Sequence, residues 1–167
     1  MEQPQIELIV RLTARMSAAA FATALLLFSF STGPHPGRIR RALQILWAFV
    51  AVHTVHFGFV VWLAAVTSGA NIDDRGGWPL MVVVAALFYG SSFAILRLWR
   101  DVDSHRRAAA DARPGAYAGV AFIAVVFLNS YLARAQDMPI YGLAAIGMIA
   151  VVAVYFVRAR VAIAAHH

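Results

Sequence analysis

Five stretches of the chain are each long and apolar enough to cross a lipid bilayer as a single helix. No other feature of the sequence limits the fold as strongly, because a spanning helix needs about 20 mostly apolar residues. The five stretches run approximately over residues 9–31, 42–66, 78–99, 116–133 and 139–157. No segment shows the period-two alternation of a half-buried strand. The sequence therefore predicts an all-α, polytopic integral membrane protein, in which residues 1–167 form a single transmembrane domain, a bundle of five helices.

The composition agrees with this prediction. Hydrophobic residues make up 62% of the 167 residues and charged residues only 13%, whereas a typical soluble domain is about 25% charged. Such a chain has too little polar surface to cover itself in water. The first apolar stretch has no small-x-small cleavage site before the next helix, so we expect it to remain as a span.

The connections between the predicted helices are rich in turn-forming residues. The first reads TGPHPG over residues 32–37, and the second reads TSGANIDDRGG over residues 67–77. Glycine, proline and Asx residues at this density favour turns. The last connection, residues 134–138, is so short that the fourth and fifth helices must form an antiparallel hairpin. The polar connection over residues 100–115 has room for a short surface helix.

The arginines predict how the bundle is oriented in the membrane. All 14 basic residues are arginine. If the N-terminus lies outside, ten of them fall on the cytoplasmic side and four outside, as the positive-inside rule requires. We therefore expect an outside N-terminus and a cytoplasmic C-terminus, in a bacterial-type inner membrane. The arginines stand at the ends of the apolar runs, so the expected partners are membrane lipids and not nucleic acid.

Tryptophans mark the predicted membrane boundaries. They stand near predicted helix ends, where aromatic side chains favour the interface between lipid and water. The four are Trp47, Trp62, Trp78 and Trp99.

Missing residue types and motifs exclude several kinds of site. The chain has no cysteine, which excludes disulfides, iron–sulfur clusters, thiolate zinc sites and cysteine nucleophiles. It also contains no glycine-rich phosphate loop, HExxH or Ser-x-x-Lys motif. Redox chemistry in this chain would need a bound cofactor or a metal held by histidine.

The stretch HTVHFG, residues 53–58, places two histidines inside the second apolar run. His53 and His56 lie ~16 and ~21 Å along that helix from residue 42, and their i, i+3 spacing puts both rings on one face. Ionisable groups at this depth are costly and are functional candidates by default. Three roles stay open for the two histidines. The first is binding of haem or another metal, and the second is lining of a proton path or substrate pocket. The third is a structural role, with hydrogen bonds to a backbone carbonyl or to Thr54, Ser91, Ser92, Asn129 or Tyr131. The remaining histidines, His35, His105, His166 and His167, lie in predicted loops or at the tail.

Other polar and sulfur-containing residues are candidates for the same site. Arg11 and Arg15 form an i, i+4 pair whose guanidinium groups suit carboxylates such as haem propionates, or lipid phosphate. Candidates for lining an interior pocket are Ser91, Ser92, Asn129 and Tyr131, and possible soft metal ligands are Met16, Met81, Met138 and Met148.

Residues 10–65 resemble the start of a ferric-reductase-like transmembrane domain, the family that includes the haem-binding membrane subunit of the periplasmic methionine-sulfoxide reductase. The resembling segments are VRLTARMSAAAFATALLLFSFSTGP and GRIRRALQILWAFVAVHTVHFGFVVWLA. The resemblance implies that His53 or His56 ligates b haem and that the protein transfers electrons. Members of the family supply partner histidines from later helices, whereas the later predicted helices here contain none.

Two further functions remain open beside electron transfer through b haem. One is a non-catalytic subunit of a larger membrane complex, or a homo-oligomer, in which the histidines are structural. Its support is the fifth apolar run, GLAAIGMIAVVAVYFV over residues 142–157, which is apolar all round. The other is a small membrane enzyme or carrier for a lipid-soluble substrate.

Overall fold

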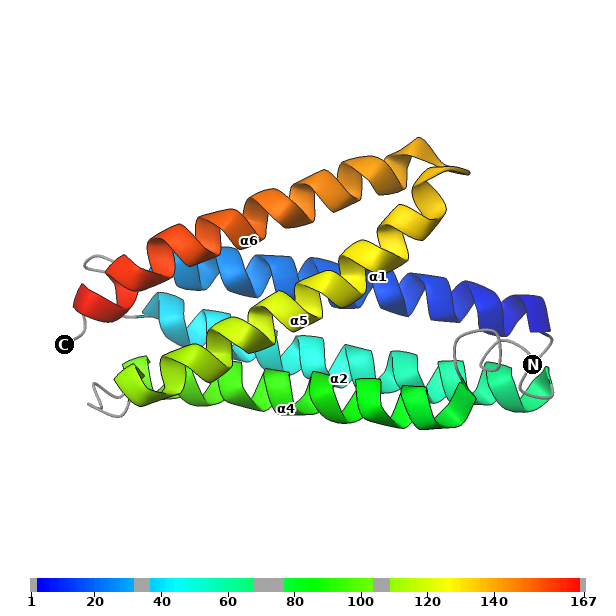
Figure 1. The fold of residues 1–167 in the computed structure, drawn as a ribbon, viewed down its shortest axis with the longest axis horizontal. Helices are drawn as coiled ribbons and strands as arrows, with labels where there is room; N and C mark the ends of the chain where they lie inside the picture. Colours follow the sequence, from blue (N-terminus) through cyan, green and yellow to red (C-terminus); the bar gives the residue numbers. More distant parts are fainter. Residues whose placement is uncertain (1–2, 32–36, 68–76, 104–108, 166–167) are drawn as a thin grey trace.

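The computed structural model describes residues 3–31, 37–67, 77–103 and 109–165. Five helices account for nearly all of them: α1 (Gln3–Ser29), α2 (Gly37–Val66), α4 (Gly77–Asp103), α5 (Ala109–Ala135) and α6 (Pro139–Ala165) (Figure 1). Each is long and apolar enough to cross a membrane. The all-α prediction is confirmed, and five such helices indicate a multi-pass membrane protein.

The helices extend beyond the apolar stretches that predicted them. The first begins at Gln3, and the last continues to Ala165. The surface helix expected within residues 100–115 is wrong for the described residues, because α4 itself runs to Asp103 and α5 begins at Ala109. Residues 104–108 lie outside the described part of the chain. Charged residues thus extend the spanning helices past the apolar belt instead of forming a separate element.

Successive helices run antiparallel and pack into a ring. α1 lies along α2, α4 along α5 and α5 along α6, and α6 returns to α1. The pair α2 and α4 has by far the sparsest contact of these pairs, although the two helices are consecutive. The hairpin of α5 and α6 ends short of α1 and α2 on the side where α1 begins (Figure 1). We call this side the N-terminal end of the bundle.

Aromatic side chains fill the bundle interior. Four buried phenylalanines from four different helices contact one another: Phe21, Phe49, Phe88 and Phe127. The ring centroids of Phe21 and Phe49, for example, are 5.0 Å apart. We call these four residues the phenylalanine cluster. Nearer the other end, Trp99 stacks on Phe28 with ring centroids 4.5 Å apart.

Trp99 differs from the other tryptophans in its surroundings, and its predicted place at the membrane boundary stays a prediction. Its side chain is fully buried, and its indole nitrogen donates a hydrogen bond to the Tyr155 hydroxyl at 3.4 Å. The other three tryptophans are exposed, each by 45% or more. Trp99 differs because an aromatic stack and a phenolic acceptor lie beside it inside the bundle.

A glycine allows α4 and α5 to pack closely. A Cβ atom placed on Gly119 would lie 2.8 Å from the backbone oxygen of Ser91. Small residues at such crossings let two membrane helices approach each other. Ser91 thus forms part of a helix contact.

Candidate functional site

The two intramembrane histidines bond to hydroxyl groups on α1. His53 Nδ1 lies 3.0 Å from Ser17 Oγ, and His56 Nδ1 lies 3.1 Å from Thr13 Oγ1. Because α1 and α2 are antiparallel, Thr13 lies beside His56, and Ser17, four residues later in α1, lies beside His53, three residues earlier in α2. The ring centroids of the two histidines are 5.3 Å apart. The pairs form two successive rungs of one polar ladder between α1 and α2.

The contacts of Thr13 favour one tautomer of His56. A hydroxyl has one proton to donate, and Thr13 Oγ1 lies 2.7 Å from the Ile9 carbonyl oxygen and 3.1 Å from that of Val10. When the proton points to one of these carbonyls, Thr13 Oγ1 accepts a hydrogen bond from His56 Nδ1–H. Nε2 then carries the lone pair that a metal or a hydrogen-bond donor would use. A hydrogen bond at one ring nitrogen is the usual way in which a histidine that ligates through the other is held in position.

A cavity of about 690 Å³ lies between α2, α4 and α5. We call it the histidine cavity because His53 and His56 both line it. Its walls are mostly apolar, with Phe57, Val84 and Val126 among them, and its polar lining residues include Asn129 and Arg134 on α5. The sparse contact between α2 and α4 explains why space remains there. The volume lies within the range of about 300–1,000 Å³ usual for small-molecule sites.

A second cavity of about 320 Å³ adjoins the first on the other side of His56. It is lined by the N-terminal half of α1 and by the ends of α5 and α6 that face each other at the hairpin. We call it the arginine cavity because Arg11, Arg15 and Arg134 line it, together with Glu7. Five residues line both cavities: His56, Val60, Met81, Ser130 and Arg134. The two spaces therefore share a wall that contains His56.

Neutral oxygen atoms hold two of these arginines in place. Arg15 Nη2 donates a 2.6 Å hydrogen bond to the Tyr141 hydroxyl, and its guanidinium carbon lies 5.4 Å from the centre of that ring. Arg134 Nη1 donates to the Ser130 carbonyl at 2.8 Å and to the Ser130 hydroxyl at 2.6 Å. The hydrogen bond between Arg15 and Tyr141 joins the middle of α1 to the first turn of α6.

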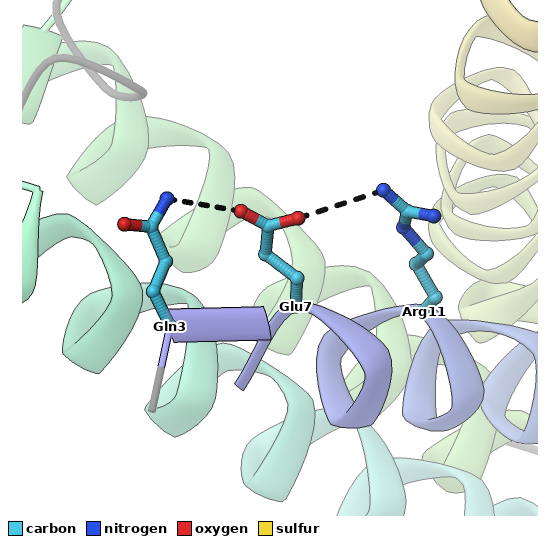
Figure 2. A network of polar contacts seen from close by, with 3 residues as sticks. All are labelled: Gln3, Glu7 and Arg11. Atoms are coloured by element: carbon cyan, nitrogen blue, oxygen red, sulfur yellow. Dashed lines mark hydrogen bonds and ion pairs between the residues drawn. The ribbon is translucent and has the colours of Figure 1, made fainter. Parts of the chain in front are cut away.

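A polar stripe on α1 leads from the N-terminal end of the bundle toward the arginine cavity. Gln3 donates a 3.1 Å hydrogen bond to Glu7, and Glu7 lies 3.6 Å from Arg11, as Figure 2 shows. Arg15 follows one turn later, so the stripe repeats every four residues. Charged side chains within a spanning helix usually face the bundle interior or a water-filled space. The first turns of α1 extend beyond the α5–α6 hairpin (Figure 1).

The phenylalanine cluster borders the histidine cavity toward the other end of the bundle. Phe88 stacks on the His53 ring with centroids 3.7 Å apart, and Phe127 meets the same ring edge-on at 6.2 Å. Phe49 approaches it to 6.0 Å. Buried aromatic rings provide no hydrogen-bonding path, so in the described structure the polar residues around the histidines continue toward the N-terminal end.

The structure brings some of the predicted site residues together and separates others. His53, His56, Arg11, Arg15, Asn129 and Tyr131 line one or both cavities. Ser91 packs against Gly119, and the buried Ser92 hydroxyl donates to the Phe88 carbonyl; neither lines these cavities. Thr54 accepts a hydrogen bond from Tyr89. The side-chain contacts of the histidines thus go to Thr13 and Ser17, which were not expected from the sequence. His56 also makes a hydrogen bond to the backbone of Val10, the kind of partner that was expected.

Of the four methionines considered as soft ligands, Met81 alone lines these cavities. Met16 and Met138 are largely exposed, and Met148 is buried elsewhere on α6. His35, His105, His166 and His167 lie outside the described residues. Arg134 and Tyr141 were also missed, although both flank the short connection between α5 and α6.

The described residues around His56 offer few ligands to a bare metal ion. Within the described residues, no group of three or more His, Cys, Asp and Glu side chains could hold a metal together. Haem would supply four nitrogen ligands of its own and take one or two from the protein. His56 on α2 and Met81 on α4 line the same two cavities and are the residues that would hold it.

A scan against protein-family models gives no match, and neither the curated proteins nor the solved structures contain a significant relative.

Proposed function

We propose that this multi-pass membrane protein binds b haem in the histidine cavity and transfers single electrons. His56 and Met81 would hold the haem iron, and Arg134 at the polar side of the cavity would pair with a propionate. The observation that carries the proposal is the 3.1 Å contact between His56 Nδ1 and Thr13 Oγ1, which holds the ring by one nitrogen beside the cavity. The resemblance of residues 10–65 to ferric-reductase-like domains supports the same assignment.

Each participating residue of the chain has a defined task. Thr13 holds the His56 ring and its tautomer, while Ser17 bonds to the neighbouring His53. Phe88 covers one face of His53 and keeps that side of the cavity dry. Bound haem supplies a reversible one-electron couple, which none of the side chains here provides. The arginine asymmetry supports an orientation with the N-terminal end of the bundle outside. In the proposed bacterial-type inner membrane, both cavities would then face the outer half.

Visible absorption spectra of the detergent-purified protein, oxidised and dithionite-reduced, test this proposal. We expect a b-type spectrum that His56→Ala abolishes or shifts. Because methionine ligation raises the reduction potential of a haem, Met81→Leu should lower the midpoint potential. Met148→Leu is the matched control, since this methionine is buried outside both cavities. A colourless protein after expression with haem supplied would refute haem binding.

A second candidate is a carrier or enzyme for a lipid-soluble substrate. It is favoured by the lining of the histidine cavity, which combines apolar walls with Asn129, Ser130 and Arg134. A colourless protein that retains a co-purified lipid-soluble compound, and releases it on His56→Ala, would support this function in place of electron transfer.

A third candidate is a subunit of a larger membrane complex or of a homo-oligomer. The apolar face of α6 that includes Ile140, Leu143, Ile146 and Ile149 is exposed in the isolated chain, and native mass spectrometry in mild detergent would reveal an oligomer.

A further inference from the structure

The arginine cavity concentrates positive charge that the described carboxylates do not neutralise. Three arginines and one glutamate line it, and the glutamate is 3.6 Å from Arg11. Arg15 and Arg134 instead bond to a phenol and to a serine, both neutral. Two positive charges are thus left for a ligand.

The hydrogen bonds inside the cavity leave further donors available. The Tyr141 hydroxyl accepts the bond from Arg15 and so keeps its own proton to donate. The Ser130 hydroxyl accepts from Arg134 and likewise keeps its proton. Each guanidinium carries five N–H groups, of which these contacts use only a part. The cavity therefore offers several donors but few acceptors, which is the complement of an oxyanion.

The same bonds fix the arginines in advance. Arg15 contacts Tyr141 twice, through the hydroxyl bond of 2.6 Å and through the ring, whose centre lies 5.4 Å from the guanidinium carbon. Arg134 is tied to the helix turn that precedes it. A side chain that is already ordered loses less entropy when it binds a ligand, so binding is stronger. A pair of arginines that merely reached toward lipid at the helix end would not need these contacts.

We propose that the arginine cavity is a binding site for an oxyanion, a phosphate or carboxylate group, held by Arg15 and Arg134 with the hydroxyls of Tyr141 and Ser130. The proposed route of entry follows the Gln3–Glu7–Arg11 stripe of α1 (Figure 2), at the end of the bundle where α1 extends beyond the α5–α6 hairpin (Figure 1). This site goes beyond the proposed electron transfer, since it requires no haem; Arg134 lines both cavities and would serve either group. An anionic lipid headgroup and free phosphate both carry the required chemistry.

Binding to the full-length protein in neutral detergent tests the proposal, with haem content measured on each sample so that the two proposals fail separately. The probes are phosphatidylglycerol, followed by native mass spectrometry, and inorganic phosphate, followed by calorimetry. We expect one saturable site, weakened about tenfold or more by Arg15→Gln or Arg134→Gln through loss of a charge-assisted hydrogen bond. Arg40→Gln is the matched control, because Arg40 is an exposed arginine in the first turn of α2 at the other end of the bundle.

Tyr141→Phe is a second variant that keeps every charge and removes the hydroxyl bonded to Arg15; we expect it to weaken binding too. Circular dichroism establishes that each variant is folded. Saturable binding of phosphate alone, or of the lipid alone, supports the site and identifies the source of the oxyanion. The proposal is overturned if folded wild-type protein binds neither probe saturably, or if Arg40→Gln weakens binding as much as Arg134→Gln.

Discussion

Replacing Thr13 with valine removes one of the two histidine–hydroxyl contacts between α1 and α2, the one made by His56. Valine keeps the shape of threonine but removes the oxygen that accepts the 3.1 Å bond from His56. Hydrogen bonds between membrane helices contribute about 0.6 kcal/mol on average and about 1.7 kcal/mol at most. Because His56 would lose a fixed acceptor inside the bundle, we expect Thr13→Val to lower the free energy of unfolding by about 0.5–1.5 kcal/mol.

Thr23→Val is the matched control for this change. Thr23 lies on the same helix, and its hydroxyl makes the same kind of backbone bond, 2.8 Å to the Ala19 carbonyl, but its side chain is exposed. It therefore reports the effect of removing a threonine hydroxyl without the interhelical bond. Unfolding by SDS in mixed micelles, followed by tryptophan fluorescence, gives the stability of each variant.

A double-mutant cycle between Thr13→Val and His56→Leu measures the rung itself. The expected coupling energy is about 0.5–1.5 kcal/mol. In parallel, ¹⁵N NMR of labelled histidine should show His56 protonated at Nδ1 in the wild type. A coupling energy within error of zero, a Thr23→Val effect equal to that of Thr13→Val, or an Nε2-protonated His56 would refute the assignment of this bond.

Two other predictions concern packing and topology. Gly119→Ala should destabilise the protein by about 1–3 kcal/mol, because the new methyl group would meet the backbone of Ser91. Gly147→Ala is the control: this glycine has open space around it, so the change should be neutral or stabilising by up to about 1 kcal/mol. Chemical denaturation of both variants compares their free energies of unfolding. With the N-terminus outside, a membrane-impermeant thiol reagent added to cells should label a cysteine at Ala70 and miss one at Ala109, and the reverse pattern would invert the orientation.

Hydropathy predicted the number and type of the helices well, and their ends less well. The apolar cores of all five helices were identified because about 20 apolar residues in a row have few other solutions. The ends were missed because charged residues such as Arg100 and Asp101 continue the helix beyond the apolar belt. The burial of Trp99 was also not predicted. Its position near a predicted end did not reveal that Phe28 and Tyr155 would enclose it.

The candidate site was predicted in its centre but not in its contacts. His53 and His56 stood out because each is a costly residue in an apolar run. Thr13 and Ser17 did not, since hydroxyl residues commonly bond to their own helix in membranes. A signal was present in the sequence. In an antiparallel pair joined by a short connection, residues equally far from the connection lie opposite each other, and this rule pairs Thr13 with His56 and Ser17 with His53. Arg134 and Tyr141 depended on the tilt of a hairpin, which hydropathy does not encode.

The sparse contact between α2 and α4 has a consequence for how the protein is made. The chain divides there into two units that each pack tightly along their length, the α1–α2 hairpin and the α4–α5–α6 segment. Each unit can leave the insertion machinery as a packed group of helices before the other is complete. The walls of the histidine cavity come from both units, so the cavity forms only when they dock in the bilayer. Assembly of the ring, and not synthesis of either half, is then the step that completes the proposed binding site.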